Sequence, residues 1–158
     1  MDVKKNAVAL FMVELLTRCL KQPEAHGELF HFTEDAFIHL DEGSDSVTAN
    51  FPLFFALHLA VLLGFRIHDN YSIKYPVFDL QGGNFVAEKP THSHFLDGKQ
   101  AEVTSHLLKI MQPEELEELK LNQDFRRNLL QAYETYYALH MQDFGKMKTL
   151  PVLREILD

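Results

Sequence analysis

The sequence predicts a mostly α-helical fold: one bundle of six to seven helices with a small β-hairpin insert at about residues 70–90. Hydrophobic residues make up 46% of the 158 positions and charged residues 24%, values typical of a globular domain. A chain of this length buries about 70% of its extended surface, which is enough for one core. Since no repeat or change of composition divides the chain, we expect residues 1–158 to form a single domain.

Two helices are predicted in the first quarter of the chain. Residues 3–21 confine their polar side chains to one narrow stripe, which is typical of a helix covered by neighbours on most sides, and Pro23 ends that helix. A second helix is expected from about residue 25 to residue 40, with Gly43 as its terminator. One face of this helix is marked by Leu29, Phe32, Ala36 and Leu40.

The third predicted helix is the most apolar segment of the sequence. Residues 41–50 form a polar stretch that favours a loop, Asn50 can cap the helix, and Pro52 suits its first turn. From residue 51 to residue 63, only His58 is polar beyond the proline. We therefore expect this helix to lie near the centre of the bundle.

The helical period disappears between residues 65 and 90. Two short strands, 75–80 and 84–86, flank the pair Gly82-Gly83, as in a β-hairpin. A ribbon of two strands is marginally stable alone, so the insert is expected to pack on the helices.

The C-terminal half predicts four further helical segments. Asp97 and Gln100 have the spacing of a capping box before one helix, and Pro113 opens a short acidic one. Asn122 can cap a long amphipathic helix, and a final helix covers residues 150–157. The stripe of the long helix comprises Phe125, Leu129, Tyr133, Tyr136 and His140.

The charge and the cysteine count exclude several classes of protein. With 15 basic and 23 acidic side chains the net charge is −8, which disfavours unaided binding to nucleic-acid phosphates. Cys19 is the single cysteine, so intramolecular disulfides and multi-cysteine zinc sites are excluded, and a reducing cytoplasm is expected. The longest apolar stretch, residues 51–65, is shorter than the roughly 20 residues that span a bilayer, so no membrane role is predicted.

Histidines offer the one candidate metal site. His92 and His94 alternate on an extended segment and could share an ion with His68, Asp97 or His106. Loop histidines held by ordinary hydrogen bonds are the favoured interpretation, and a metal-dependent enzyme is kept as the alternative function. His58 is expected to be a core histidine bonded to a partner.

Sequence motifs of catalysis are missing. The chain has no nucleophile elbow, phosphate loop or dinucleotide fingerprint, and Gly82-Gly83 lacks the strand-to-helix context that such loops need. We therefore predict a protein that is not an enzyme and that uses no cofactor.

Basic side chains are the candidate binding residues. Arginine beside apolar surface can receive an acidic peptide or a carboxylate through forked hydrogen bonds. The residues in question are Arg18, Lys21, Arg126 and Arg127. A solvated helix face is the competing interpretation of the same residues.

Short motifs occur in a fixed order along nearly the whole chain. They are Leu10-Phe-Met-Val-Glu14, Leu29-Phe-His-Phe32, Ala49-Asn-Phe-Pro-Leu53, Leu63-Gly-Phe65, Val77-Phe-Asp-Leu80, Tyr136-Tyr-Ala-Leu-His140 and Leu150-Pro-Val-Leu-Arg-Glu155. In this order and spacing they resemble the C-terminal domain of the bacterial recombination mediator RecO, in the version without zinc-binding cysteines.

The resemblance implies a role in DNA repair and recombination without catalysis. It implies a helical domain that docks RecR and the acidic, Phe-ended tail of single-strand-binding protein, so that RecA loads at gaps near the nucleoid. In this family an oligonucleotide-binding (OB) barrel precedes the helices and makes the main DNA contacts; it is expected to be absent from this chain. The family's zinc cysteines would lie near residues 70–73 and 87–90, where this sequence has none, so zinc is not carried over and core packing by Phe78, Leu80 and Phe85 is expected to replace it.

Overall fold

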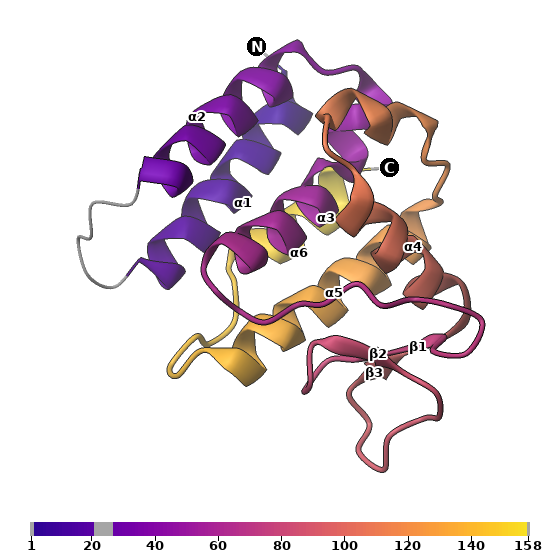
Figure 1. Cartoon of the computed structure of the whole chain (residues 1–158). Helices are drawn as coiled ribbons and strands as arrows, with labels where there is room; N and C mark the ends of the chain where they lie inside the picture. Colours follow the sequence, from indigo (N-terminus) through magenta and orange to yellow (C-terminus); the bar gives the residue numbers. More distant parts are fainter. Residues whose placement is uncertain (1, 21–26, 158) are drawn as a thin grey trace.

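The computed structural model describes residues 2–20 and 27–157, and it confirms the predicted fold class (Figure 1). In that part of the chain, six α-helices and one short 3₁₀ helix form a bundle, and a small antiparallel sheet lies at one end of it. The elements are α1 (Val3–Cys19), α2 (Gly27–Glu42), α3 (Asp45–Leu62), β1 (Val77–Asp79), β2 (Asn84–Val86), β3 (Phe95–Leu96), α4 (Gly98–Lys109), η1 (Pro113–Glu118), α5 (Gln123–His140) and α6 (Thr149–Ile156).

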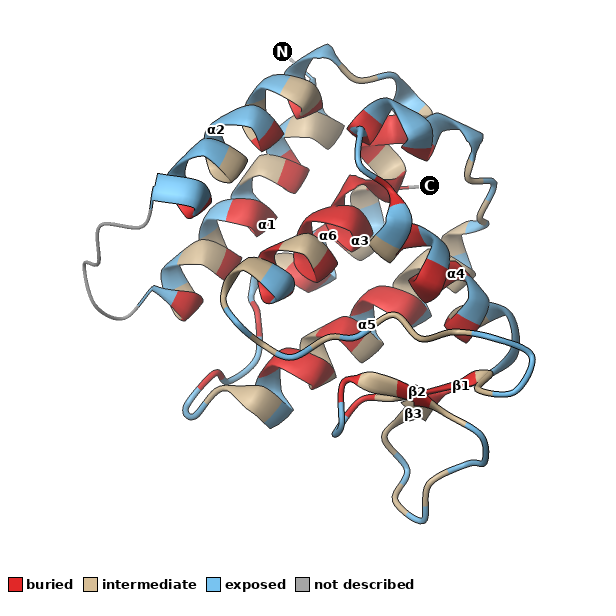
Figure 2. Cartoon of the chain, viewed as in Figure 1, coloured by how far each residue is buried: buried red, intermediate tan, exposed pale blue. Residues whose placement is uncertain are grey.

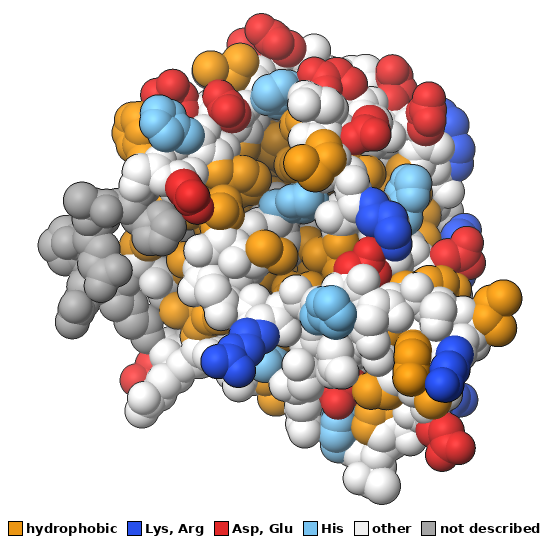
Figure 3. Space-filling view, viewed as in Figure 1, with side chains coloured by type: hydrophobic (Ala, Val, Ile, Leu, Met, Phe, Trp, Pro, Cys, Tyr) orange, Lys and Arg blue, Asp and Glu red, His pale blue; other side chains and the backbone are white. Residues whose placement is uncertain are grey.

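Helix α3 forms the centre of the bundle, as the sequence predicts. It contacts α1, α2, α4, α5 and η1, and Figure 2 shows buried residues along it and on the helix faces around it. It is the one described helix long and apolar enough to cross a membrane, yet 67% of it is buried inside this fold, as expected of a core helix. The outer surface carries the acidic charge, and Asp and Glu side chains gather on the upper part of the face in Figure 3.

The start of α3 differs from the sequence prediction. The helix begins at Asp45, not at residue 51, because the Ser44 hydroxyl caps it by accepting the Val47 backbone N–H at 3.3 Å. Of the predicted loop 41–50, residues 41–42 therefore end α2 and residues 45–50 begin α3, which leaves only 43 and 44 outside the helices. Pro52 lies inside the helix instead of in its first turn.

Asn50 has a different role from the predicted helix cap. Its side chain is buried and donates from Nδ2 to the carbonyl oxygens of Leu116 at 3.0 Å and Leu119 at 2.8 Å. These carbonyls lie at the end of η1, where a 3₁₀ helix has no further backbone donors of its own. Asn50 therefore fixes η1 against the central helix.

The insert is a sheet of three strands in the order β2-β1-β3, not the predicted hairpin of two. Phe78 pairs with Phe85 on β2 and with Leu96 on β3, and all three side chains are buried. The third strand is only two residues long and follows a histidine-containing loop, so no periodic signal marks it. Leu80 is also buried, and the predicted packing core of the insert is thus confirmed.

Asn70 covers the outer edge of the sheet. Its Nδ2 donates to the Phe85 carbonyl oxygen at 2.9 Å, and its Oδ1 accepts the Phe85 backbone N–H at 2.8 Å. One amide side chain thus makes both hydrogen bonds that a further strand would make at this residue.

Capping of the later helices follows the sequence in part. Asn122 caps α5 as predicted, accepting the Phe125 backbone N–H at 2.8 Å. Asp97 precedes α4 but makes no capping hydrogen bond, and instead forms an ion pair with Lys89 at 3.3 Å. The capping-box prediction is therefore wrong for α4.

Helix α1 is less covered than its sequence pattern predicts. Its buried face includes Cys19, the expected core cysteine. An apolar stripe on its other side stays 46–65% exposed, comprising Val3, Leu10, Val13 and Leu20. The predicted end of this helix at Pro23 and the predicted start of the next at residue 25 lie outside the described residues.

Gly83 allows the turn between β1 and β2 to approach the chain before the sheet. Its φ is +73°, and an added Cβ would lie 2.5 Å from the Arg66 carbonyl oxygen. We expect Gly83→Ala to lower the free energy of unfolding by about 1–3 kcal/mol, because it adds backbone strain and a backbone clash. Urea denaturation followed by circular dichroism measures this loss.

Gly27→Ala is the matched control for that variant. Gly27 begins α2, and an added Cβ there meets nothing within 4 Å. The control is expected to match the parent protein or to exceed its stability slightly. Equal stability of the two variants would contradict the close approach at Gly83.

Candidate partner-binding site

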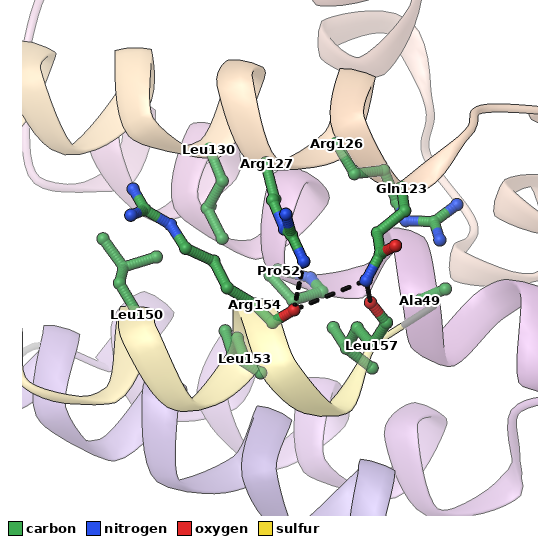
Figure 4. A pocket seen from close by; sticks show the side chains of 10 residues that line it. All are labelled: Ala49, Pro52, Gln123, Arg126, Arg127, Leu130, Leu150, Leu153, Arg154 and Leu157. Carbon is green, nitrogen blue, oxygen red and sulfur yellow. Dashed lines mark hydrogen bonds between the residues drawn. The ribbon is translucent and has the colours of Figure 1, made fainter.

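Helices α5 and α6 present matching faces to each other. On α5, Gln123, Arg126, Arg127 and Leu130 recur at the spacing i, i+3, i+4 and i+7, which places them on one side of the helix. On α6, Leu150, Leu153, Arg154 and Leu157 have the same spacing. With Ala49 and Pro52 of α3 they line a slot (Figure 4).

Arg127 and Gln123 fasten α6 to α5. Arg127 Nη2 donates to the Arg154 carbonyl oxygen at 2.8 Å, and Gln123 Nε2 donates to the Leu157 carbonyl oxygen at 3.0 Å (Figure 4). These carbonyls belong to the last turn of α6, where a cation is also favoured by the helix dipole. The guanidinium of Arg127 is therefore part of the wall, and its Nε is buried without a partner among the described residues.

Arg126 borders a second, larger hollow. Its Nη1 donates to the Leu121 carbonyl oxygen at 2.6 Å, and the side chain lines both the slot and this hollow. We call the hollow the cationic basin, because its lining among residues 2–20 and 27–157 includes Lys4, Lys99, Lys120 and Arg126 and one acidic residue, Asp45. The cavity of the basin is about 530 Å³ and that of the slot is about 30 Å³.

The slot and the basin differ in the size of the ligand that they can receive. A volume of about 30 Å³ holds roughly one water molecule, whereas small-ligand sites usually have 300–1,000 Å³. In the described conformation the basin is thus large enough to receive a ligand. The slot receives an apolar side chain only if its leucines move apart.

Arg18 lies at the other end of α6. Its guanidinium forms an ion pair with Glu14 at 3.0 Å and donates from Nη1 to the Phe144 carbonyl oxygen at 2.6 Å. Glu14 in turn binds Thr149, the first residue of α6, whereas Arg127 binds the last turn. Since α6 has eight residues, about 12 Å of helix separates the two arginines along its axis.

Glu14 caps the start of α6. Its carboxylate accepts the Thr149 hydroxyl at 2.6 Å and the backbone N–H groups of Lys148 and Thr149 at 2.8 and 2.9 Å. Burial alone would raise the pKa of Glu14, but these bonds together with Arg18 lower it below its ordinary value. The carboxylate is therefore held ionised at neutral pH.

The four predicted binding residues thus do not form one site among the described residues. The structure brings Arg126 and Arg127 to one wall, places Arg18 at a separate ion pair, and Lys21 lies outside the described residues. Sequence reasoning missed Lys99 and Lys120, which come from different elements and meet only in the folded chain. The sequence did contain a pattern that indicates the slot. Gln123 and Arg126 on α5, and Arg154 with Leu150, Leu153 and Leu157 at the end of the chain, recur at helical spacing.

The histidine loop is held by ordinary hydrogen bonds. His92 Nε2 contacts Asp79 Oδ1 at 3.0 Å, and its Nδ1 accepts the His94 backbone N–H at 3.0 Å, so both ring nitrogens have protein partners. Among the described residues no three His, Cys, Asp or Glu side chains are grouped as metal ligands. Nothing in this geometry favours the metal-dependent enzyme.

Other candidate side chains belong to the core. His58 Nε2 binds the Leu107 carbonyl oxygen at 2.9 Å, which confirms the predicted bonded histidine, and burial lowers the pKa of this ring. Tyr133 and Tyr137 are buried and bind the Thr104 hydroxyl and the Ala56 carbonyl oxygen. Their rings are therefore not available for stacking on nucleic-acid bases.

The described residues thus form a helical domain with a cationic basin beside an apolar slot. The family model for the C-terminal part of recombination protein O matches residues 1–150. The chain belongs to this RecO C-terminal family, whose members are DNA repair and recombination proteins. No solved structure matches the chain.

Individual relatives support this assignment along the whole chain. The DNA repair protein RecO of Christiangramia forsetii is 35% identical over 153 residues, which are 96% of this chain and 62% of the relative. The RecO protein of Phocaeicola vulgatus is 30% identical over 98% of this chain and 64% of the relative. That of Azobacteroides pseudotrichonymphae is 28% identical over 98% of this chain and 63% of the relative. The chain thus spans a little less than two thirds of the length of these relatives.

Glu14→Gln tests the cap of α6. Because the pKa of Glu14 is lowered in the folded state, its stabilisation is present above the ordinary value of 4.5 and is lost as the pH falls through the folded pKa. At pH 7 the variant is expected to lose about 1–2 kcal/mol of unfolding free energy, the lower range for charged hydrogen bonds because the cap lies at the surface. Urea denaturation at pH 7 and pH 3.5 measures the difference, which is expected to shrink at the lower pH.

Glu155→Gln removes the same charge from an exposed position of α6 and serves as the control. Its expected effect at either pH is within about 0.5 kcal/mol. A deficit of Glu14→Gln that stays constant between the two pH values would contradict the ionised cap.

Proposed function

We propose that this chain is the helical docking domain of a recombination mediator and catalyses no reaction itself. In this proposal it binds the acidic, Phe-ended tail of single-strand-binding protein and contacts RecR, so that RecA loads at single-stranded gaps near the nucleoid. DNA is contacted mainly by an OB-fold domain of the family, which is distinct from the helical domain proposed for residues 1–158.

The cationic basin is the observation that carries the docking proposal. The whole chain has a net charge of −8, yet in the part of it that the structure describes four basic side chains and one acidic side chain line this hollow. An acidic peptide is repelled by most of the surface and attracted here, which gives both orientation and selectivity. The basin adjoins the apolar slot through Arg126, so charge and apolar surface are available to one ligand.

The composition of the two hollows fits a peptide that ends in an aromatic residue. Acidic side chains and the terminal carboxylate would occupy the basin, where lysine and arginine supply charge-assisted hydrogen bonds. The terminal ring would lie against the leucines of α5 and α6, notably Leu130 and Leu150. Because the slot is now narrow, the proposal requires those leucines to change rotamer on binding.

Removal of the shared arginine tests the proposal. Arg126→Ala is expected to weaken binding of a fluorescein-labelled acidic peptide ending in Phe by roughly 1–3 kcal/mol, about 5-fold to 150-fold in Kd. Fluorescence anisotropy measures the affinity. Raising the salt concentration is expected to weaken the parent complex more than the variant complex, because salt screens the charge that the variant lacks.

Lys146→Ala removes a positive charge from the exposed loop before α6 and is the matched control. Its affinity for the peptide is expected to equal that of the parent. An amidated peptide that ends in Ala instead of Phe separates the apolar contribution from the charged one. Unchanged affinity for Arg126→Ala and for substitutions of Arg18, Lys21 and Arg127 would overturn the docking proposal.

A further inference from the structure

A third hollow, which we call the acidic groove, lies between α2 and the start of η1, over the C-terminal half of α3. Its cavity is about 230 Å³. Its apolar lining comprises Phe32, Ala36, Phe54, Ile110, Met111 and Pro113. In the upper half of Figure 3 it is a hollow floored by hydrophobic side chains and a histidine. None of these residues lines the slot or the cationic basin, so this groove is separate from the site of the proposed function.

The rim of the groove is strongly acidic. Asp35 and His39 line one side, and Glu114 on η1 lies across from them, 3.5 Å from His39. The whole of α2 carries five acidic residues and η1 carries four, and neither element contains a lysine or an arginine. Figure 3 shows Asp and Glu side chains gathered around the hollow. An acidic ligand would therefore be repelled from this groove.

The floor of the groove combines buried apolar side chains, such as Phe54 at 4% exposure, with one hydrogen-bond acceptor. Met111 is 79% exposed at the edge, although the turn that carries it is fixed by Glu115, whose carboxylate accepts the Met111 backbone N–H at 3.0 Å. His58 lies on the floor against Phe54, with 4.4 Å between ring centroids. Because its Nε2 proton is held by the Leu107 carbonyl oxygen, the lone pair of Nδ1 can accept an N–H group from a ligand.

We infer that this groove docks a basic amphipathic segment of another protein, with an apolar anchor over Phe54 and lysine or arginine side chains at the acidic rim. Flexible methionine and aromatic residues in a groove between helices are typical of surfaces that receive an amphipathic helix. The acidic rim favours a partner with basic side chains, and the apolar floor favours one with an apolar side chain between them. This charge preference is opposite to that of the cationic basin, so the chain would hold two partners of opposite charge on separate surfaces.

Peptide titrations test the inference with the whole chain. The probe is the amidated peptide acetyl-Lys-Leu-Leu-Lys-Trp-Leu-Lys-Lys, added to ¹⁵N-labelled protein and followed by NMR. We expect shift changes confined to amides of the groove, such as those of Ala36, His58 and Met111. Two comparison peptides, one with every Lys replaced by Glu and one with every Leu and Trp replaced by Ser, are expected to produce none there.

Surface variants locate the determinant. Glu114→Lys is expected to weaken the basic peptide ~5-fold to 10-fold by replacing attraction with repulsion at the rim. Glu118→Lys makes the same change at an exposed position on another face of this 3₁₀ helix and is the matched control, with an expected change of less than about twofold. Met111→Glu is expected to strengthen the charge attraction but to weaken anchoring, so that binding becomes more salt-sensitive.

Three results would overturn the inference. The first is equal weakening by Glu114→Lys and Glu118→Lys, which would indicate nonspecific attraction to the acidic surface. The second is a shift pattern centred on the slot of α5 and α6. The third is a dimer in analytical ultracentrifugation that Met111→Glu dissociates, since the occupant would then be a second copy of the chain.

Discussion

Helix α3 is stable in water because five neighbouring elements cover its apolar surface, and the rest of the structure is arranged to keep that cover in place. Each buried leucine or phenylalanine contributes about 1.5–3 kcal/mol when it leaves water, so α3 is the largest single source of stability. Apolar contact is non-directional, so it does not by itself fix where each covering element lies. The covering elements are held by polar side chains that donate to backbone carbonyl oxygens.

Those tethers follow one pattern across the molecule. Asn50 binds the carbonyls at the end of η1, Tyr137 binds the Ala56 carbonyl on α3 at 2.6 Å, and Arg127 binds the last turn of α6. His140 binds the Leu80 carbonyl oxygen at 2.9 Å and so attaches the sheet to α5. In each case a side chain donates to a backbone carbonyl oxygen of another element and so sets the position of that element. The Arg154 carbonyl lies in the last turn of α6, which leaves it open, whereas the Ala56 carbonyl lies inside α3 and gains Tyr137 as a second donor.

The sequence could predict what depends on local patterns. The helical period indicated the bundle, Asn122 indicated the start of α5, and the apolar run indicated the central helix. It could not predict hydrogen bonds between distant residues. The residues around Asn50 are compatible with a helix cap, and nothing near it in the sequence indicates that it binds a carbonyl oxygen 66 positions away. The same limit applies to the cationic basin, since Lys4, Lys99 and Lys120 share no spacing that a pattern can detect.

The position of η1 determines the separation of the two charged surfaces. Pro113, its first residue, lines the acidic groove, and Leu119, which follows its last residue, lines the cationic basin. The element that Asn50 holds thus separates the cationic basin, for which we propose an acidic ligand, from the acidic groove, for which we infer a basic one. A shift of η1 along α3 would therefore change the linings of both hollows.

Arg126 and Arg127 are adjacent in sequence, but they contact different elements and so have different roles. Arg127 donates to the Arg154 carbonyl oxygen at the end of α6, and its loss would leave this oxygen without the donor and loosen the slot itself. Arg126 lines the basin as well as the slot, and it also donates to the Leu121 carbonyl oxygen. Variants of either arginine therefore affect stability as well as recognition, and the free energy of unfolding, measured beside the affinity, separates the two effects.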